Sequence, residues 1–135
     1  MASKGKIKVL MAQFPLETHS RGLITVAGML RDAGMEVIML GNALPEHVIA
    51  TAVQESVDVI GISTYCGGEL ALSTELINAA EKKGIKKTTA FLIGGIFPPH
   101  DIPKLKELGF DGAFLSATKA QIVDCINTAV AAKKK

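Results

Sequence analysis

Cysteine is scarce in this sequence, whose 135 residues contain only Cys66 and Cys125. The two lie far apart and show neither the spacing of a metal site nor that of a redox pair, so reduced thiols are the simplest interpretation. Cys125 falls on the apolar face of an expected C-terminal helix and is predicted to be part of the core. Cys66 follows an expected strand, and a structural role is favoured over a reactive one there.

Long apolar runs are also missing. No run approaches the roughly 18 to 20 residues that span a bilayer, and the N-terminus lacks the charged-then-apolar arrangement of a secretory signal. The formal charge of +2 comes largely from lysines near the two ends, which is typical of solvated termini rather than of a nucleic-acid surface. We therefore expect a cytoplasmic protein that binds neither membranes nor nucleic acid.

The sequence does contain a regular alternation of apolar runs and segments of helical period. The length and the 48% hydrophobic content fit a single domain over residues 1–135, with a basic tail at 131–135 that we expect to be disordered. Apolar runs without polar alternation indicate strands buried on both faces. The pattern predicts an α/β fold, a flavodoxin-like (Rossmann-like) doubly wound five-stranded parallel sheet. The expected strands are Ile7 to Met11, Val37 to Leu40, Val57 to Ile62, Ala90 to Ile93 and Ala113 to Leu115.

Helix boundaries are marked by proline and glycine. The first helical stripe begins at Leu23 and closes at Gly34, and the second helix starts with Pro45. The fourth is short and ends before Gly109. Five helices alternating with five strands place the loops after the strands at one edge of the sheet, where residues distant in sequence surround a ligand.

Polar and glycine residues follow four of the expected strands at that edge. Each has an ordinary explanation as a turn, a helix cap or a helix start, but their joint appearance favours a binding site, and the glycines indicate a close approach to backbone. No Gly-x-Gly-x-x-Gly follows a strand, so a dinucleotide site is not predicted. The residues in question are Gln13, Glu17, His19 and Gly22, then Ser63, Thr64, Tyr65, Gly67 and Gly68, then Gly94, Gly95, Phe97, Pro98 and Pro99, and finally Ser116, Ala117 and Thr118.

The segment Glu17-Thr18-His19-Ser20-Arg21-Gly22 places an acid two residues before a histidine. An imidazole becomes a good metal ligand when one ring nitrogen donates its proton to a carboxylate and the other keeps its lone pair. Taken alone, the segment is better explained as a polar loop with Ser20 as helix cap. A nucleophile-and-base pair of Ser63 or Cys66 with His19 lacks an oxyanion hole and a third member.

These blocks together resemble the cobalamin-binding domain of the carbon-skeleton mutases, the family of methylmalonyl-CoA mutase and glutamate mutase. The family motif is Asp-x-His-x-x-Gly, then Ser-x-Leu, then Gly-Gly. The resemblance covers essentially the whole chain, and residues 23 to 62 and 66 to 93 separate the blocks at the family's spacing. The matching residues are Glu17, His19 and Gly22, then Ser63 and Tyr65, then Gly94 and Gly95.

By this resemblance the cofactor is adenosylcobalamin, and His19 is the cobalt ligand that displaces the cofactor's own base. The detached nucleotide tail is expected in a slot between the sheet and the helices. Cofactor-binding residues are then expected at Gln13, Glu17, Thr18, His19, Ser20, Arg21, Gly22, Ser63, Thr64, Tyr65, Gly94, Gly95, Phe97, Ser116 and Thr118.

Three positions depart from the family pattern. Glu17 replaces the aspartate that orients the histidine, Gln13 replaces a lysine that supports this acid, and Tyr65 replaces the leucine. The first two changes alter how strongly His19 donates to cobalt. Tyr65 adds a ring and a hydroxyl beside the expected tail.

The resemblance implies a cobalamin-binding small subunit of an adenosylcobalamin-dependent acyl-CoA mutase, an isomerase. The barrel that binds the acyl-CoA in this family needs on the order of 250 residues, so we expect it in a separate large subunit. Two alternatives stay open: a methyl-carrying corrinoid protein, whose usual helical bundle has no room before Ile7, and a degenerate flavodoxin-like module that has lost cobalamin. A phosphoacceptor receiver is disfavoured because the first strand is not followed by an acidic pair.

Overall fold

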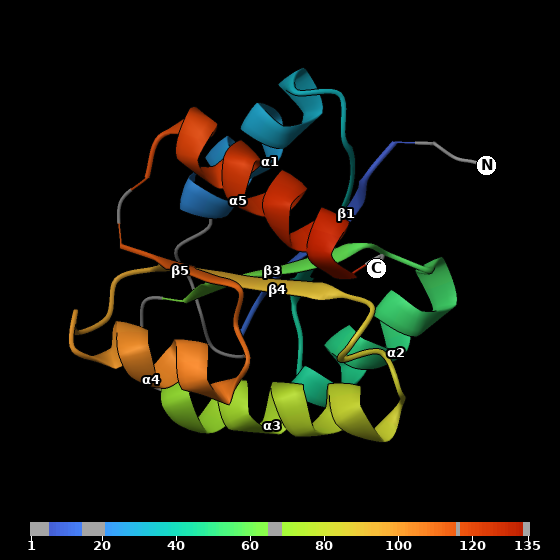
Figure 1. Ribbon diagram of the computed structural model, residues 1–135, viewed down its shortest axis with the longest axis vertical. Helices are drawn as coiled ribbons and strands as arrows, with labels where there is room; N and C mark the ends of the chain where they lie inside the picture. The colour runs from blue at the N-terminus through green and yellow to red at the C-terminus, as the bar shows by residue number, and fades with distance from the viewer. Residues whose placement is uncertain (1–5, 15–20, 65–68, 116, 134–135) are drawn as a thin grey trace.

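The sheet has five parallel strands in the order β2-β1-β3-β4-β5. A computed structural model describes residues 6–14, 21–64, 69–115 and 117–133 of the chain. The strand order, with helices on both faces of the sheet, confirms the predicted flavodoxin-like, doubly wound fold (Figure 1). The strands are β1 (Lys8–Gln13), β2 (Glu36–Asn42), β3 (Val59–Thr64), β4 (Ala90–Gly95) and β5 (Gly112–Phe114). The helices are α1 (Arg21–Asp32), α2 (Pro45–Glu55), α3 (Glu69–Lys82), α4 (Asp101–Leu108) and α5 (Lys119–Lys133).

The helices form two layers, with α1 and α5 on one face of the sheet and α2, α3 and α4 on the other (Figure 1). Because side chains alternate along a strand, each strand contributes to both faces. Two separate apolar cores result, and this explains why the strands lack polar alternation. The α1/α5 core contains Val9, Met11, Leu23, Leu30, Val59, Leu92, Ile122 and Ile126. The α2–α4 core contains Leu10, Val48, Ile49, Ile60, Leu76, Phe91, Ile93 and Leu105.

Two aspartates fix the strand register at the N-terminal edge of the sheet. The backbone N–H of Lys8 donates to the Asp58 carboxylate, and that of Phe91 donates to the Asp111 carboxylate, each over 2.9 Å. The backbone N–H groups of Asp58 and Asp111 donate in return to the carbonyls of Lys8 and Phe91, over 2.8 and 2.7 Å. These reciprocal pairs tie β3 to β1 and β5 to β4 where the strands begin.

All five predicted strands are present, and their ends differ from the prediction by up to two residues, as β3 shows at both of its ends. Pro45 opens α2 and Gly34 follows α1 with a φ of 89°, as expected. The basic tail predicted at 131–135 is helical up to Lys133, because the Lys133 ammonium donates to the Lys86 carbonyl over 3.3 Å and lies 3.6 Å from the Asp111 carboxylate. Among the described residues, no helix has the length and apolar character needed to cross a membrane.

Gly95 ends β4 in a conformation that side chains rarely adopt, with a φ of 140°. A Cβ atom there would lie 1.8 Å from the Thr64 carbonyl oxygen, a backbone atom of β3 that cannot give way. We therefore predict that Gly95→Ala lowers the free energy of unfolding by roughly 3 kcal/mol, through strain and overpacking. Urea unfolding followed by circular dichroism measures this change.

Gly28→Ala is the matched control, since no atom lies within 4 Å of a Cβ at this position inside α1. It should stabilise the protein by about 0.5–1 kcal/mol, because alanine restricts the unfolded chain and favours the helix. Equal unfolding midpoints for the two variants would contradict the role assigned to Gly95.

Candidate functional site

The strand register brings residues at the ends of separate strands into one row across the carboxyl end of the sheet. Gln13 pairs with Asn42 on one side and with Ser63 on the other. Ser63 pairs with Gly94, which in turn pairs with Phe114. We call these five residues the mouth row. Three of the predicted site residues, Gln13, Ser63 and Gly94, therefore lie side by side on adjacent strands.

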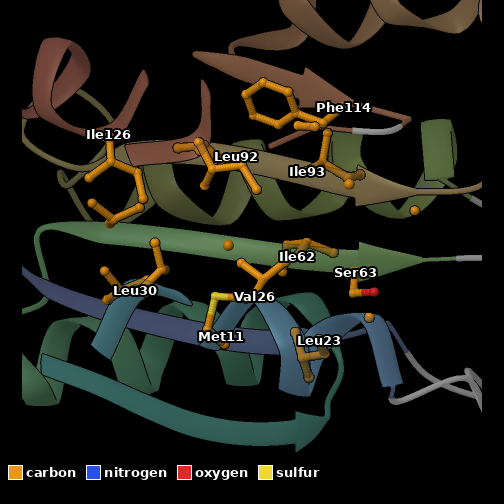
Figure 2. Close-up of a pocket in the computed structure, with 18 of the residues that line it drawn as sticks. Met11, Leu23, Val26, Leu30, Ile62, Ser63, Leu92, Ile93, Phe114 and Ile126 are labelled. Carbon is orange, nitrogen blue, oxygen red and sulfur yellow. The ribbon is translucent and has the colours of Figure 1, made fainter. Parts of the chain in front are cut away.

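A cavity of about 320 Å³ extends from the mouth row into the space between the sheet and helices α1 and α5. Gly22, Ser63 and Gly94 line its mouth end. Figure 2 shows side chains from α1, β1, β4, β5 and α5 along its walls, with Ser63 at the end of β3. The deeper walls are apolar and include Met11, Val26, Leu30, Leu92 and Ile126.

Gly61 and Gly94 lack side chains on the face of the sheet that the cavity adjoins, with different consequences. A Cβ on Gly61 would lie 2.8 Å from the Met11 sulfur, so the Met11 side chain occupies the place where a β3 side chain would project. At Gly94 a Cβ would meet the Phe114 carbonyl oxygen at 3.4 Å, which is close but tolerable. Gly94 therefore leaves space free in the cavity, whereas the neighbouring Gly95 is required because a side chain there would clash with the backbone of β3.

The described part of the cavity carries no ionisable side chain, and Ser63 supplies its one polar side chain. A cluster of charges lies at the opposite edge of the sheet, where Lys133 pairs with Asp111. Burial lowers the pKa of Lys86 there, and the neighbouring Lys133 lowers it further. Burial and the Asp111 charge raise the pKa of the Cys125 thiol, so this cysteine stays protonated at neutral pH. No group of three or more potential metal ligands occurs among the residues that the structure describes.

Three residues predicted for the site have other surroundings in the structure. Phe97 is 5% exposed and belongs to the α2–α4 core, away from the cavity. Thr64 is completely buried and follows Ser63, so its side chain projects from the opposite face of β3. The Thr118 hydroxyl accepts from the Gln121 N–H, and the Gln121 side chain accepts from the Thr118 N–H. This reciprocal cap starts α5.

Several predicted residues lie outside the described residues: Glu17, Thr18, His19, Ser20, Tyr65 and Ser116. The elements on either side of the first four are described. Gln13 ends β1 in the mouth row, and Arg21 begins α1 directly before the cavity-lining Gly22. Phe14 is fully buried, and its carbonyl accepts a hydrogen bond from the Asn42 side chain over 3.1 Å.

The apolar walls were missed as site residues, because Val26, Leu30, Ile122 and Ile126 follow the same period as any core residue. The helical stripes identify these residues as buried but do not distinguish a filled core from a lined cavity. Gly61 was the available signal, since a glycine inside a buried strand often marks a close approach of backbone to another group.

Comparison with known proteins identifies the family. A family model described as the B12 binding domain matches residues 7–123. The chain is 38% identical, over 94% of each protein, to the 2-hydroxyisobutanoyl-CoA mutase small subunit of Aquincola tertiaricarbonis. It is 34% identical to the pivalyl-CoA mutase small subunit of Xanthobacter autotrophicus, over 96% of this chain and 86% of that protein.

Solved structures agree on the fold. A cobalamin-binding protein from Desulfitobacterium hafniense superposes with a TM-score of 0.79 at 20% identity, over 93% of this chain and 60% of that one. At this identity the likeness concerns the fold alone, whereas the family match rests on sequence. The chain belongs to the B12-binding domain family and is similar, over nearly its whole length, to mutase small subunits.

Proposed function

We propose that the protein is the cobalamin-binding small subunit of an adenosylcobalamin-dependent acyl-CoA mutase. The observation that carries this proposal is the cavity beneath the mouth row, found in a chain whose family binds B12. Relatives that match nearly the whole chain are named as small subunits of acyl-CoA mutases. The cytoplasmic location stays a prediction of the sequence.

The cavity suits the detached nucleotide tail of a corrinoid. Its volume of about 320 Å³ lies within the range of pockets that hold small ligands, and its walls are apolar, as a flat aromatic base requires. Gly22 and Gly94 at the mouth leave clearance for a linker that passes close to backbone. The residues that line the cavity therefore fit the nucleotide tail of a corrinoid.

Each polar residue near the mouth has a role in this proposal. The Ser63 hydroxyl, on a side chain that is nearly buried, donates to a ring nitrogen of the base. His19 is the cobalt ligand, and Glu17 accepts the proton of its other ring nitrogen. Gln13, 2% exposed at the end of β1, supports this pair from the mouth row.

When bound, adenosylcobalamin supplies the radical chemistry of carbon-skeleton rearrangement. The described cavity offers no charged group to bind a CoA thioester. We therefore assign the acyl-CoA site to a large, barrel-type subunit, which the mouth row would face. The contribution of this chain is to hold the cofactor's tail away from the metal and to present His19 in its place.

The His19 assignment is tested by an absorbance titration with adenosylcobalamin and hydroxocobalamin. We expect the native protein to produce a base-off, histidine-on spectrum, and His19→Ala to bind with the spectral signature of histidine ligation lost. His47→Ala is the matched control, since His47 is exposed in the first turn of α2. A histidine-on spectrum that survives in His19→Ala would exclude His19 as the ligand.

The cavity assignment is tested by Gly94→Val, which places a branched side chain in the space beneath the mouth row. We expect the fold to persist and the affinity for cobalamin to fall at least about ten-fold, because overpacking of this kind costs about 1–3 kcal/mol. Gly28→Val on α1, where a Cβ meets open space, should bind normally. Unchanged binding by a folded Gly94→Val protein would remove the cavity from the site.

A further inference from the structure

The deep part of the cavity is unusually poor in hydrogen-bonding groups. Ser63, the one polar side chain among the described lining residues, lies at the mouth. The backbone groups of β1, β3 and β4 are engaged, because each of these strands pairs with a neighbour on both sides. Backbone groups inside α1 and α5 bond within their helices. A ligand that enters beyond Ser63 therefore meets carbon and sulfur.

Met11 contributes the sulfur. Its side chain is 5% exposed and lies across Gly61, where an added Cβ would approach the sulfur to 2.8 Å. A thioether is soft and polarizable and forms favourable contacts with aromatic rings. It is only a weak hydrogen-bond acceptor. The Met11 position on β1 thus favours an apolar aromatic group in the cavity over a polar one.

We infer that this chain discriminates between corrinoids by their lower base, and that its apolar wall favours a benzimidazole over a purine. The inference rests on the proposed function, since it concerns which cofactor the same site accepts. A benzimidazole has one free ring nitrogen in the detached tail, which Ser63 satisfies at the mouth. A purine carries further ring nitrogens and an exocyclic group, and these would lose their water without gaining partners.

The unpaired polar groups of a bound purine set the size of the expected preference for benzimidazole. A hydrophobic pocket rejects an added polar group by up to about a hundred-fold, because the group is buried without a full partner. We expect the dissociation constant for an adenine-containing cobamide to exceed that for dimethylbenzimidazolyl cobamide by at least about ten-fold, which corresponds to about 1.4 kcal/mol.

The primary experiment titrates the native protein with these two cobamides, both in the same upper-ligand form, and measures each dissociation constant by absorbance. A dissociation constant for the adenine-containing cobamide that is at least about ten times the other supports the inference. Equal affinities would overturn the inference and leave the proposed function standing. Failure to bind either cobamide would overturn the proposed function and the inference with it.

The wall itself is tested by Met11→Gln, which adds an amide at nearly constant length. We expect this variant to bind the adenine-containing cobamide relatively better and to lower the ratio about three-fold or more, since the amide can pair with a purine. Met39→Gln is the matched control. Met39 pairs with Met11 in the sheet register but is 38% exposed and does not line the cavity, so its ratio should match that of the native protein.

A second variant covers the case in which a buried glutamine prevents folding. Val26→Thr keeps the side-chain shape and brings a hydroxyl to the cavity wall from α1. It should also lower the ratio, while circular dichroism and the thermal midpoint confirm the fold. A native ratio in every folded wall variant would show that the wall does not select the base.

Discussion

The register of the parallel strands is the constraint on which the site depends. Gln13, Ser63 and Gly94 lie at strand ends far apart in sequence, and they become neighbours because β1, β3 and β4 pair without a slip. A shift by one residue would turn a strand's side chains to the opposite face and remove Ser63 from the cavity. Asp58 and Asp111 fix the register from the other edge of the sheet.

The cavity reflects a conflict between packing and binding. Both faces of the sheet are covered, and interiors normally fill such space because empty volume is destabilising. Here Gly94 places no side chain on the α1/α5 face, and Gly61 makes room for the Met11 side chain. Gly95, one residue after Gly94, is required because a Cβ there would clash with the Thr64 carbonyl. The α2–α4 face contains its own filled core, including Phe97. Because the α2–α4 core is fully packed, the α1/α5 face can contain a cavity without loss of the fold.

Sequence reasoning predicts the fold well, because apolar runs without alternation and helical stripes each have one simple structural solution. It also predicts Ser63 and Gly94, since strand ends in this fold meet at one edge. It does not decide which face of the sheet a residue after a strand takes: Phe97 is predicted for the site, and the structure packs it in the α2–α4 core. The Thr-x-x-Gln spacing that begins at Thr118 is typical of a capping box, and the Thr118 hydroxyl does cap α5 by accepting from the Gln121 N–H.

In the proposed complex the detached base of the cofactor lies between the sheet and helices α1 and α5. The most direct measurement is an isotope-edited nuclear Overhauser experiment on protein with labelled methionine methyl groups, bound to diamagnetic cobalamin. We expect cross-peaks between the methyl protons of the benzimidazole and the methyl group of Met11, which lines the cavity, and none to Met39, which does not. Bound cobalamin without contact to Met11 would contradict this position of the base.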